Sequence, residues 1–271
     1  MKLIGAAVLL AILVMLAYPY IAGTKMPPYE ETSINISYRE PLKGEDIGLK
    51  TNATGKVILD QSHSNLVVIG DNSTHTYFAS LFSKAGYSLD APGSKDRFRD
   101  SLLLMRSPDI LVISAPLESY NESGLIANIV NNGGKLILIG DGRLSEKNIN
   151  EISVPLGIIF NGDMVYDIHE SYKNYKNPLV YNFAGHNITQ GLRNFVIYDG
   201  SSISGGNPIA FAGSNAESSK GLKELPVLSV IKFGKGYVVA VGDSDLWSNE
   251  HIFDLDNRNL LVNIINWLQE V

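Results

Sequence analysis

The sequence predicts an α/β protein with a doubly wound, mostly parallel β-sheet and a β-rich C-terminal half, preceded by one N-terminal transmembrane helix. From residue 56 onward, short aliphatic segments of strand type alternate with segments whose apolar residues recur at helical spacing, which predicts the sheet and its covering helices. The uncharged run from Leu3 to Ala22 predicts the transmembrane helix. The chain is therefore divided into an anchor or signal segment at 1–22, a juxtamembrane linker at 23–55 and a folded domain at 56–271.

The N-terminal apolar run would be about 30 Å long as a helix, the thickness of a bilayer core. A cleaved signal peptide is the alternative, but its apolar part is shorter and ends in small residues. Tyr18, Pro19 and Tyr20 occupy the place of a cleavage site and resemble an interfacial aromatic belt. We therefore favour an uncleaved signal-anchor, with the protein in the cell membrane as a single-pass protein and its C-terminal domain outside the cytoplasm.

Five N-x-S/T sequons agree with an external domain and predict a glycoprotein. An Asn-rich chain would contain roughly half this number by chance, so the agreement is modest. The glycosylation candidates are Asn35, Asn52, Asn72, Asn121 and Asn187.

Along the chain, residues 23–55 have little apolar periodicity and read as an extended linker, with one added edge strand near 34–38. The domain then alternates strands and helices. Strands are expected at 56–60, 87–90, 109–114 and 135–141, and helices at 74–85, 98–105 and 123–131. Residues 227–243 predict a hairpin that turns at Gly234-Lys235-Gly236, and an amphipathic helix at 257–270 closes the chain.

Composition excludes several classes of function. The 271-residue chain carries a net charge of −6 without any run of Lys or Arg, which argues against nucleic acid as a partner. It contains no Cys, which excludes disulfides, thiolate metal sites and a Cys nucleophile. No Walker A or G-x-G-x-x-G pattern is present, so no cofactor is expected.

Three of the expected strands end in an acid: Asp60, Asp141 and Asp243. In a doubly wound sheet ligands bind beyond the carboxyl ends of the strands, so this rim is where a site is expected. The ligand-binding candidates are Asp60, Ser62, His63, Asn65, Asp141, Asp243, Asp245 and Asn249, with His251, Asp254 and Asp256 close by in sequence. We predict that His63, Asp141 and Asp243 converge on one rim, with Arg143 and Arg258 as the nearest basic residues in sequence.

These residues allow three interpretations. The rim could hold a cation, or it could form a Ser/His/Asp hydrolase site. Each Asp could also simply cap the loop or helix that follows its strand, without any ligand. Ser62 lacks a G-x-S-x-G elbow, so a serine nucleophile is not expected, and whether the rim binds a metal stays open.

A family resemblance rests on four stretches: VILDQSHSN, NNGGKLILIGDG, HNITQGL and GKGYVVAVGDSDLWSNEHIFDLDNRNLLVNIINWL. Together they resemble the class I glutamine-amidotransferase-like (flavodoxin-like) domains of unknown function, which are common in archaea and bacteria. These are related to the auxiliary domain of gliding-motility-type ABC transporters and to the N-terminal domain of an intraflagellar transport protein. The resemblance covers about residues 56–271 and implies a flavodoxin-like fold.

In true amidotransferases a Cys lies on the elbow after the strand that corresponds to residues 135–139, whereas this chain has Gly140-Asp141-Gly142 there. An Asp cannot perform thiolate acyl transfer, so the resemblance implies a pseudoenzyme. We therefore expect a non-catalytic, membrane-anchored extracytoplasmic binding module with a protein partner, such as an accessory subunit of an ABC-type transporter or another envelope complex. The alternative is a hydrolase, with or without a metal, that uses the Asp60/His63/Asp243 rim.

Overall fold

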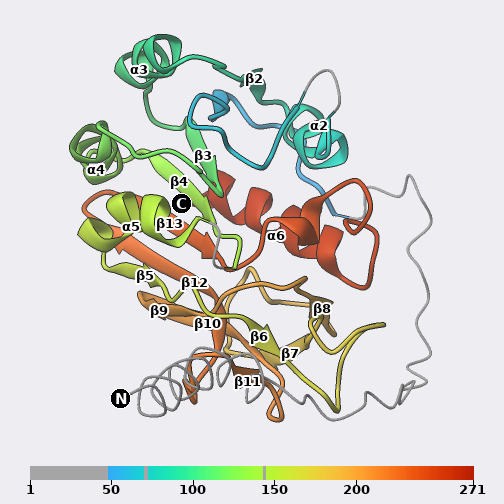
Figure 1. The fold of residues 1–271 in the computed structure, drawn as a ribbon. Helices are drawn as coiled ribbons and strands as arrows, with labels where there is room; N and C mark the ends of the chain where they lie inside the picture. Colours follow the sequence, from blue (N-terminus) through green and yellow to red (C-terminus); the bar gives the residue numbers. More distant parts are fainter. Residues whose placement is uncertain (1–47, 70–72, 143–144) are drawn as a thin grey trace, which may run out of the picture. The chain divides into compact units, whose positions relative to one another are not determined.

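A nine-stranded mixed β-sheet organises the chain in the computed structural model, which describes residues 48–69, 73–142 and 145–271 (Figure 1). The strand order is β2-β1-β3-β4-β13-β12-β10-β7-β8. The described residues lie within one unit, residues 33–271. The strands of this sheet are β1 (Lys56–Leu59), β2 (Ser88–Asp90), β3 (Ile110–Ser114), β4 (Lys135–Ile139), β7 (Leu179–Phe183), β8 (Phe195–Val196), β10 (Asn207–Ala212), β12 (Pro226–Phe233) and β13 (Gly236–Val241).

Helices cover both faces of the parallel part of the sheet, and a separate core lies under each group. One core contains apolar side chains of α2 (Thr76–Ala85) and α6 (Asn257–Glu270). The other contains side chains of α3 (Lys95–Leu104), α4 (Ser123–Asn131) and α5 (Glu146–Ser153). Successive β4 residues alternate between the two cores, as the pleat of a strand requires. This is why the strand sequences are apolar without interruption.

The second half of the chain adds two small sheets, which pair β5 (Ile158–Phe160) with β9 (Ile203–Gly205) and β6 (Val165–Tyr166) with β11 (Glu217–Ser218). Two short 3-10 helices, η1 (Val154–Leu156) and η2 (Asp245–Trp247), complete the described elements.

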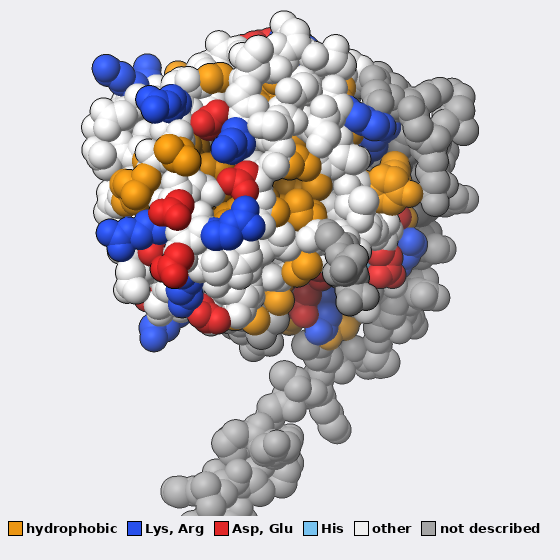
Figure 2. All heavy atoms as spheres, turned by 90° about the horizontal axis from the view of Figure 1, so that it is seen from above, with side chains coloured by type: hydrophobic (Ala, Val, Ile, Leu, Met, Phe, Trp, Pro, Cys, Tyr) orange, Lys and Arg blue, Asp and Glu red, His pale blue; other side chains and the backbone are white. Residues whose placement is uncertain are grey.

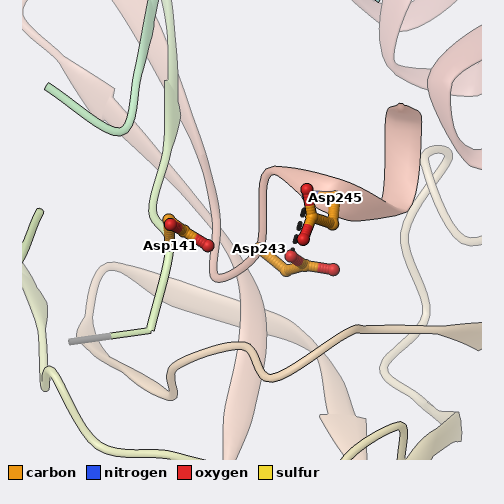
Figure 3. Close-up of side chains that lie close together, drawn as sticks. All are labelled: Asp141, Asp243 and Asp245. Carbon is orange, nitrogen blue, oxygen red and sulfur yellow. Dashed lines mark hydrogen bonds between the residues drawn. The ribbon is translucent and has the colours of Figure 1, made fainter. Parts of the chain in front are cut away.

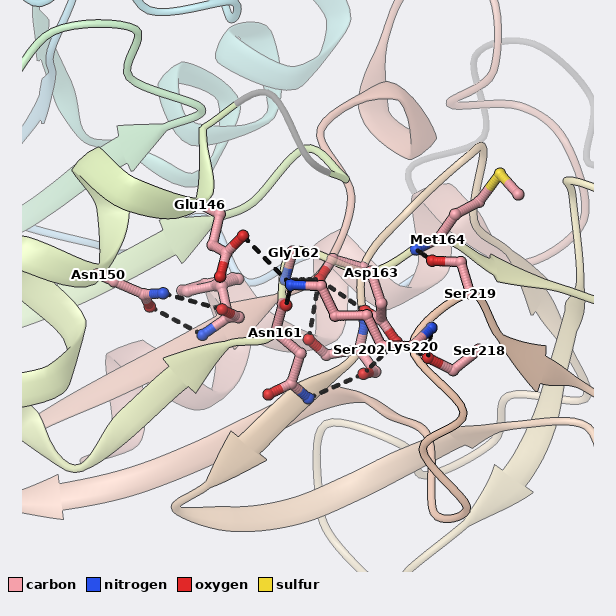
Figure 4. Close-up of polar contacts among 12 residues, drawn as sticks. Glu146, Asn150, Asn161, Gly162, Asp163, Met164, Ser202, Ser218, Ser219 and Lys220 are labelled. Carbon is pink, nitrogen blue, oxygen red and sulfur yellow. Dashed lines mark hydrogen bonds and ion pairs between the residues drawn. The ribbon is translucent and has the colours of Figure 1, made fainter. Parts of the chain in front are cut away.

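The buried carboxylate of Asp163 ties these segments together (Figure 4). It accepts hydrogen bonds from the Ser201 hydroxyl at 3.0 Å, from the Ser202 amide and hydroxyl at 2.7 and 2.8 Å, and from the Ser218 hydroxyl at 2.5 Å. A buried carboxylate is tolerated only where such donors surround it. Asp163 is therefore a structural acceptor.

The elements predicted at 56–60, 123–131, 135–141 and 257–270 are present as β1, α4, β4 and α6, with ends within two residues. The predicted hairpin is present as β12 and β13. The end of the predicted linker already contacts the domain, because the Lys50 amide donates to Asn266 Oδ1 at 2.8 Å and the Asn266 amide donates to the Gly48 carbonyl at 2.7 Å. The three-part division of the chain itself stays a prediction.

The prediction of a flavodoxin-like, doubly wound and mostly parallel sheet is wrong. Four neighbouring strand pairs in the large sheet are parallel and four are antiparallel. The reason is the connection between β12 and β13, which is only two residues long, whereas a parallel crossover needs a dozen or more. β12 therefore lies antiparallel beside β13. Each of the next strands, β10, β7 and β8, is also antiparallel to the strand before it in the sheet.

The prediction of a single-pass membrane protein with an external domain is also contradicted. No helix of the described residues is long and apolar enough to cross a membrane. The longest of them, α6, has 14 residues and spans about 21 Å, short of the roughly 30 Å of a bilayer core. The predicted span itself, residues 3–22, lies outside the described residues.

The end of the molecule where α3 lies carries charges of both signs, with basic and acidic side chains interspersed among hydrophobic ones (Figure 2). Leu103 and Leu104 of α3 are 63% and 64% exposed. Exposed leucines in so small a number are normal on protein surfaces and need no ligand.

We expect Gly242→Ala to destabilise the fold. A Cβ at Gly242 would lie 2.0 Å from the Ser201 carbonyl oxygen, a backbone atom that cannot turn away. Overpacking of this kind costs about 1–3 kcal/mol. Urea unfolding measures the loss, and Gly185→Ala is the matched control, because nothing lies within 4 Å of its Cβ. Equal unfolding free energies for the two variants would contradict the close packing at Gly242.

Candidate functional site

The carboxyl ends of the parallel strands lie along one edge of the large sheet. β1, β3, β4 and β13 run in the same direction. Asp60 directly follows β1, whereas Asp141 and Asp243 each come after one intervening residue at the ends of β4 and β13. The predicted placement of these acids at strand ends is therefore present in the structure. The side chains nevertheless gather into two separate groups.

Asp141, Asp243 and Asp245 form the first group, which we call the acidic cluster (Figure 3). One carboxylate oxygen from each lies within 4.8 Å of the others. Asp141 comes from the end of β4, whereas Asp243 and Asp245 come from the segment that leads from β13 into η2. In Figure 3 the Asp141 side chain points across the gap toward the other two.

Asp243 is the fully buried member of the acidic cluster. Its Oδ2 accepts the Tyr198 and Leu246 amides at 2.8 and 3.1 Å, and its Oδ1 accepts the Asp245 amide at 2.9 Å. Burial, followed by the charges of Asp245 and Asp141, raises the pKa of Asp243 well above its usual value, against the effect of these donors. Asp243 thus resists ionisation, and its oxygens hold two loops in place beside Asp141 and Asp245.

Asp141 is partly exposed, and its environment opposes ionisation. Burial, the charge of Asp245 and the charge of Asp199 raise the pKa of Asp141 to about 6, and a hydrogen bond from Ser244 only partly offsets them. Asp199 itself lies 3.3 Å from the Lys176 ammonium. The acidic cluster therefore repels itself at neutral pH, and a positive group placed between its carboxylates would relieve that repulsion.

The turn after Asp141 fits the loop beside it only because the next residue is glycine. Gly142 has a φ of +45°, and a Cβ there would lie 2.7 Å from the Asp199 carbonyl oxygen. A glycine permits both the left-handed backbone and the close approach. The sequence Asp141-Gly142 thus lets the Asp141 carboxylate reach toward η2.

His63 belongs to the second group, which we call the buried histidine unit: Asp60, His63 and Tyr120. His63 Nδ1 lies 2.9 Å from Asp60 Oδ2, and the Tyr120 hydroxyl donates to the same oxygen. The two rings stack with centroids 3.7 Å apart. Burial alone would raise the pKa of Asp60, but hydrogen bonds from His63, Ser62 and Tyr120 outweigh it and lower that pKa.

The outer nitrogen of His63 faces Glu122. His63 Nε2 and Glu122 Oε2 lie 3.8 Å apart, and both are buried without a hydrogen-bond partner among the described residues. Ser62 Oγ donates to Asp60 Oδ1 at 2.6 Å and lies 3.0 Å from His63 Nδ1, the nitrogen that Asp60 also contacts. In a Ser/His/Asp triad the Ser and the Asp contact opposite nitrogens of the imidazole. The arrangement is not that of a triad.

The predicted convergence of His63, Asp141 and Asp243 is therefore only half right. All three lie at the same sheet edge, but among the described residues no hydrogen bond or ion pair joins His63 to the acidic cluster. β1 and β13 are separated by β3 and β4, so their ends stand about 14 Å apart at about 4.8 Å per strand.

Two other candidates have local structural roles. Asn65 accepts the His63 amide at 3.1 Å and donates to the Ser114 carbonyl at 3.1 Å. Asn249 accepts the Tyr77 amide at 3.2 Å near the start of α2. Arg143 lies outside the described residues, and Arg258 lines a groove between α2 and the loop before α6.

Of the sequons, Asn52, Asn121 and Asn187 are exposed, whereas Asn35 and Asn72 lie outside the described residues.

Sequence reasoning missed a second unit of the same kind, the partly exposed histidine unit: Asp254, His251 and Tyr198. His251 Nδ1 lies 3.1 Å from Asp254 Oδ2, the Tyr198 hydroxyl donates to that oxygen at 2.6 Å, and the rings stack at 3.7 Å. The His251 side chain is 24% exposed, whereas that of His63 is not exposed at all. The signal in the sequence is a His and an Asp three residues apart, in DQSH and in HIFD.

Left-handed backbone flanks both units. Ser64 follows His63, Asp199 follows Tyr198 and Leu255 follows Asp254, with φ values of 51°, 52° and 48°. Such conformations cost a non-glycine residue about 1–3 kcal/mol and persist only where surrounding contacts hold them. The hydrogen bonds of the two units are contacts of this kind.

A family model described as "Domain of unknown function (DUF4350)" matches residues 78–265, more than half of the chain. The chain belongs to the DUF4350 family. The match covers the elements from α2 into α6, including the acidic cluster and His251 but not β1 or His63. A comparison with curated proteins finds no match.

Solved structures share the fold of this DUF4350 domain. The mmIFT52 N-terminal domain superimposes with a TM-score of 0.65 at 18% identity, over 79% of this chain and 97% of that one. The cytoplasmic protein STM1381 from Salmonella typhimurium LT2 superimposes with a TM-score of 0.53 at 17% identity, over 80% and 100%. The first agrees with the expected likeness to an intraflagellar transport N-terminal domain. At these identities the likeness concerns the fold alone.

We expect Asp141→Asn to stabilise the DUF4350 domain at pH 7. The pKa of Asp141 in the folded protein, about 6, lies above its usual 3.8, so folding favours the protonated form. The stability that the protonated carboxyl gives to the folded state is present below pH 4 and is lost as the pH rises through 6. Asn keeps the site neutral, so the substitution should raise the free energy of unfolding by about 1–3 kcal/mol at pH 7 and leave it nearly unchanged at pH 4. Urea unfolding at both pH values measures it, and a loss at pH 7 would contradict the repulsion.

Asp254→Asn should lower the free energy of unfolding at pH 7, the opposite of the effect expected for Asp141→Asn. Although burial would raise the pKa of Asp254, hydrogen bonds from His251, Tyr198 and Tyr172 lower it from 3.8 to about 2. The stability this gives is present above pH 4 and is lost as the pH falls through 2. We expect a loss of about 2 kcal/mol at pH 7 that shrinks below pH 4. Thermal unfolding across this range tests it, with Asp100→Asn as the control, since Asp100 is exposed on α3 beyond its first turn. A pH-independent loss would mean that packing, and not charge, is responsible.

Proposed function

We propose that this DUF4350 domain is a non-catalytic binding module that takes a positively charged group at the acidic cluster. The observation that carries the proposal is the convergence of the Asp141, Asp243 and Asp245 carboxylates within 4.8 Å. Carboxylates at that separation repel one another. Burial first, and then the charges of Asp245 and Asp199, raise the pKa of Asp141 to about 6. A bound cation would turn this repulsion into attraction.

The three acids would have different roles in binding. The oxygens of Asp243 already accept backbone amides, so Asp243 fixes the positions of the surrounding loops. Asp141 and Asp245 are the more accessible members and would supply the contacting oxygens. Carboxylate oxygens suit a hard divalent cation, and they equally suit the guanidinium or ammonium group of a partner's side chain. The shared chemistry is positive charge, and the experiment below separates the two sources.

The geometry supports binding better than hydrolysis. Ser62 and Asp60 contact the same nitrogen of His63, and His63 is fully buried, so the hydrolase alternative lacks a positioned base and nucleophile. The chain has no Cys, and Asp141 stands on the turn after β4. We keep as a proposal the relation to class I glutamine-amidotransferase-like domains and to the auxiliary domains of gliding-motility-type ABC transporters. The position of Asp141, where that class carries its Cys elbow, supports it.

We further propose that the partner is a protein, so that the domain acts as a subunit in a larger complex. The fold likeness to the mmIFT52 N-terminal domain supports this only as an analogy. An acidic rim on a folded domain would receive a basic side chain from such a partner.

Calorimetric titration tests the proposal with Ca²⁺, Mg²⁺ and Mn²⁺ in one arm and an arginine-rich peptide in the other. We expect one arm to bind the wild-type protein, and Asp245→Asn to weaken that binding at least about tenfold, a change of about 1.4 kcal/mol. Binding should also weaken between pH 7 and pH 5, because protonation of Asp141, whose pKa is about 6, competes with the cation. Asp96→Asn is the matched control, since Asp96 is exposed on α3.

Two results would refute the proposed function. Binding in neither arm would remove the cationic ligand. Esterase or amidase turnover that is lost in His63→Gln would instead establish the hydrolase alternative.

A further inference from the structure

A cavity lies at the opposite edge of the sheet from the acidic cluster, where the parallel strands begin. It has a volume of about 250 Å³. Lys135, the first residue of β4, lines it, together with Thr54 before β1, Tyr87 before β2 and Gln269 near the end of α6. Ligands of open α/β sheets usually bind at the other edge, so nothing in the strand topology leads one to expect a site here.

Lys135 is the unusual residue of this cavity. It is only 4% exposed, and its ammonium donates to the Leu268 carbonyl of α6. No carboxylate of the described residues lies within ion-pair distance of it. Burial is the single cause that lowers the pKa of Lys135, with no neighbouring acid to offset it. A buried ammonium without a counter-ion is costly, and proteins usually pair it.

The bond to Leu268 explains only part of the arrangement. A cation near the C-terminal carbonyls of a helix is favourable, so Lys135 also caps α6. An ammonium has three donors, however, and this contact uses one of them. Among the described residues that line the cavity, the one acid, Glu270, is paired with Lys50.

The remaining polar wall can supply further hydrogen-bond donors, from amide and hydroxyl groups that can also accept. Asn52 contributes an amide and Thr54 a hydroxyl. Burial and the charge of Asp109 raise the pKa of Tyr87 to about 12, so its hydroxyl keeps its proton at neutral pH. Donors around an unpaired ammonium match a ligand that has several acceptor oxygens and a negative charge.

We propose that this cavity binds a small oxyanion, a phosphate, sulfate or carboxylate group, through the ammonium of Lys135. The volume is below the roughly 300 Å³ at which pockets for drug-sized ligands begin, so it fits one such group and not a whole cofactor. The group is either a free inorganic ion or the charged end of a larger molecule that extends into solvent. This site is independent of the acidic cluster and of the proposed function.

NMR titration of the full-length wild-type protein locates the binding. Sodium phosphate and sodium sulfate are added at constant ionic strength with sodium chloride as the reference, so that general screening cancels. We expect amide shifts at Ala53, Tyr87 and Gln269, with no shifts around Asp141. Shifts that are absent, or that are equal in chloride, would overturn the proposal.

Variants test the role of Lys135. Lys135→Met should raise the dissociation constant for phosphate at least tenfold, and Lys135→Arg should retain binding. Exposed Lys147→Met is the control and should bind as the wild type does. If Lys135→Met does not fold, Thr54→Val takes its place, with binding three- to tenfold weaker. Wild-type affinity in a folded Lys135→Met or in Thr54→Val would refute the assignment.

A comparison of probes separates the two sources of the group. Inorganic phosphate and glycerol 3-phosphate are titrated side by side against the wild-type protein. Tighter binding of the ester supports the charged end of a larger molecule, whereas tighter binding of the inorganic ion supports a free anion. Binding of neither contradicts the proposal.

Discussion

β13 is the strand on which both halves of the sheet depend. It pairs in parallel with β4 on one side and antiparallel with β12 on the other. It therefore joins β2, β1, β3 and β4 to β12, β10, β7 and β8. Val238 to Val241 are fully buried, and they alternate between the two cores. Because the chain leaves β13 directly into Gly242 and Asp243, the register of this one strand also sets the position of the acidic cluster. Fold and candidate site therefore share one constraint.

The sequence predicted what local periodicity and strand direction determine. Buried parallel strands leave an unbroken aliphatic pattern, and a strand that ends in Asp places that Asp at the carboxyl edge. Asp141 and Asp243 were found in this way. The same reasoning could not exclude His63 from their group, since strand order, which separates β1 from β13, is not written in any local pattern. The antiparallel extension by β10, β7 and β8 was missed because short strands in an irregular segment carry no distinct period.

The two histidine units illustrate a further limit of sequence reasoning. Each contains a local pair, a His and an Asp three residues apart, and a distant Tyr that supplies the stacking ring. Tyr120 joins Asp60 across 60 residues, and Tyr198 joins Asp254 across 56. Contacts of that range follow only from the completed fold. The same three side-chain types then serve in different surroundings, one unit inside the protein and one near its surface.

The lengths of the strands across the large sheet carry a consequence for the behaviour of the protein in concentrated solution. The sheet tapers from eight residues in β12 to three in β2 at one margin and two in β8 at the other. A marginal strand offers its unpaired amides and carbonyls as a template for another chain, and the hazard grows with its length. Margins this short present few such groups. A sheet of nine strands is thereby protected against edge-to-edge association and the fibrous aggregates to which it leads.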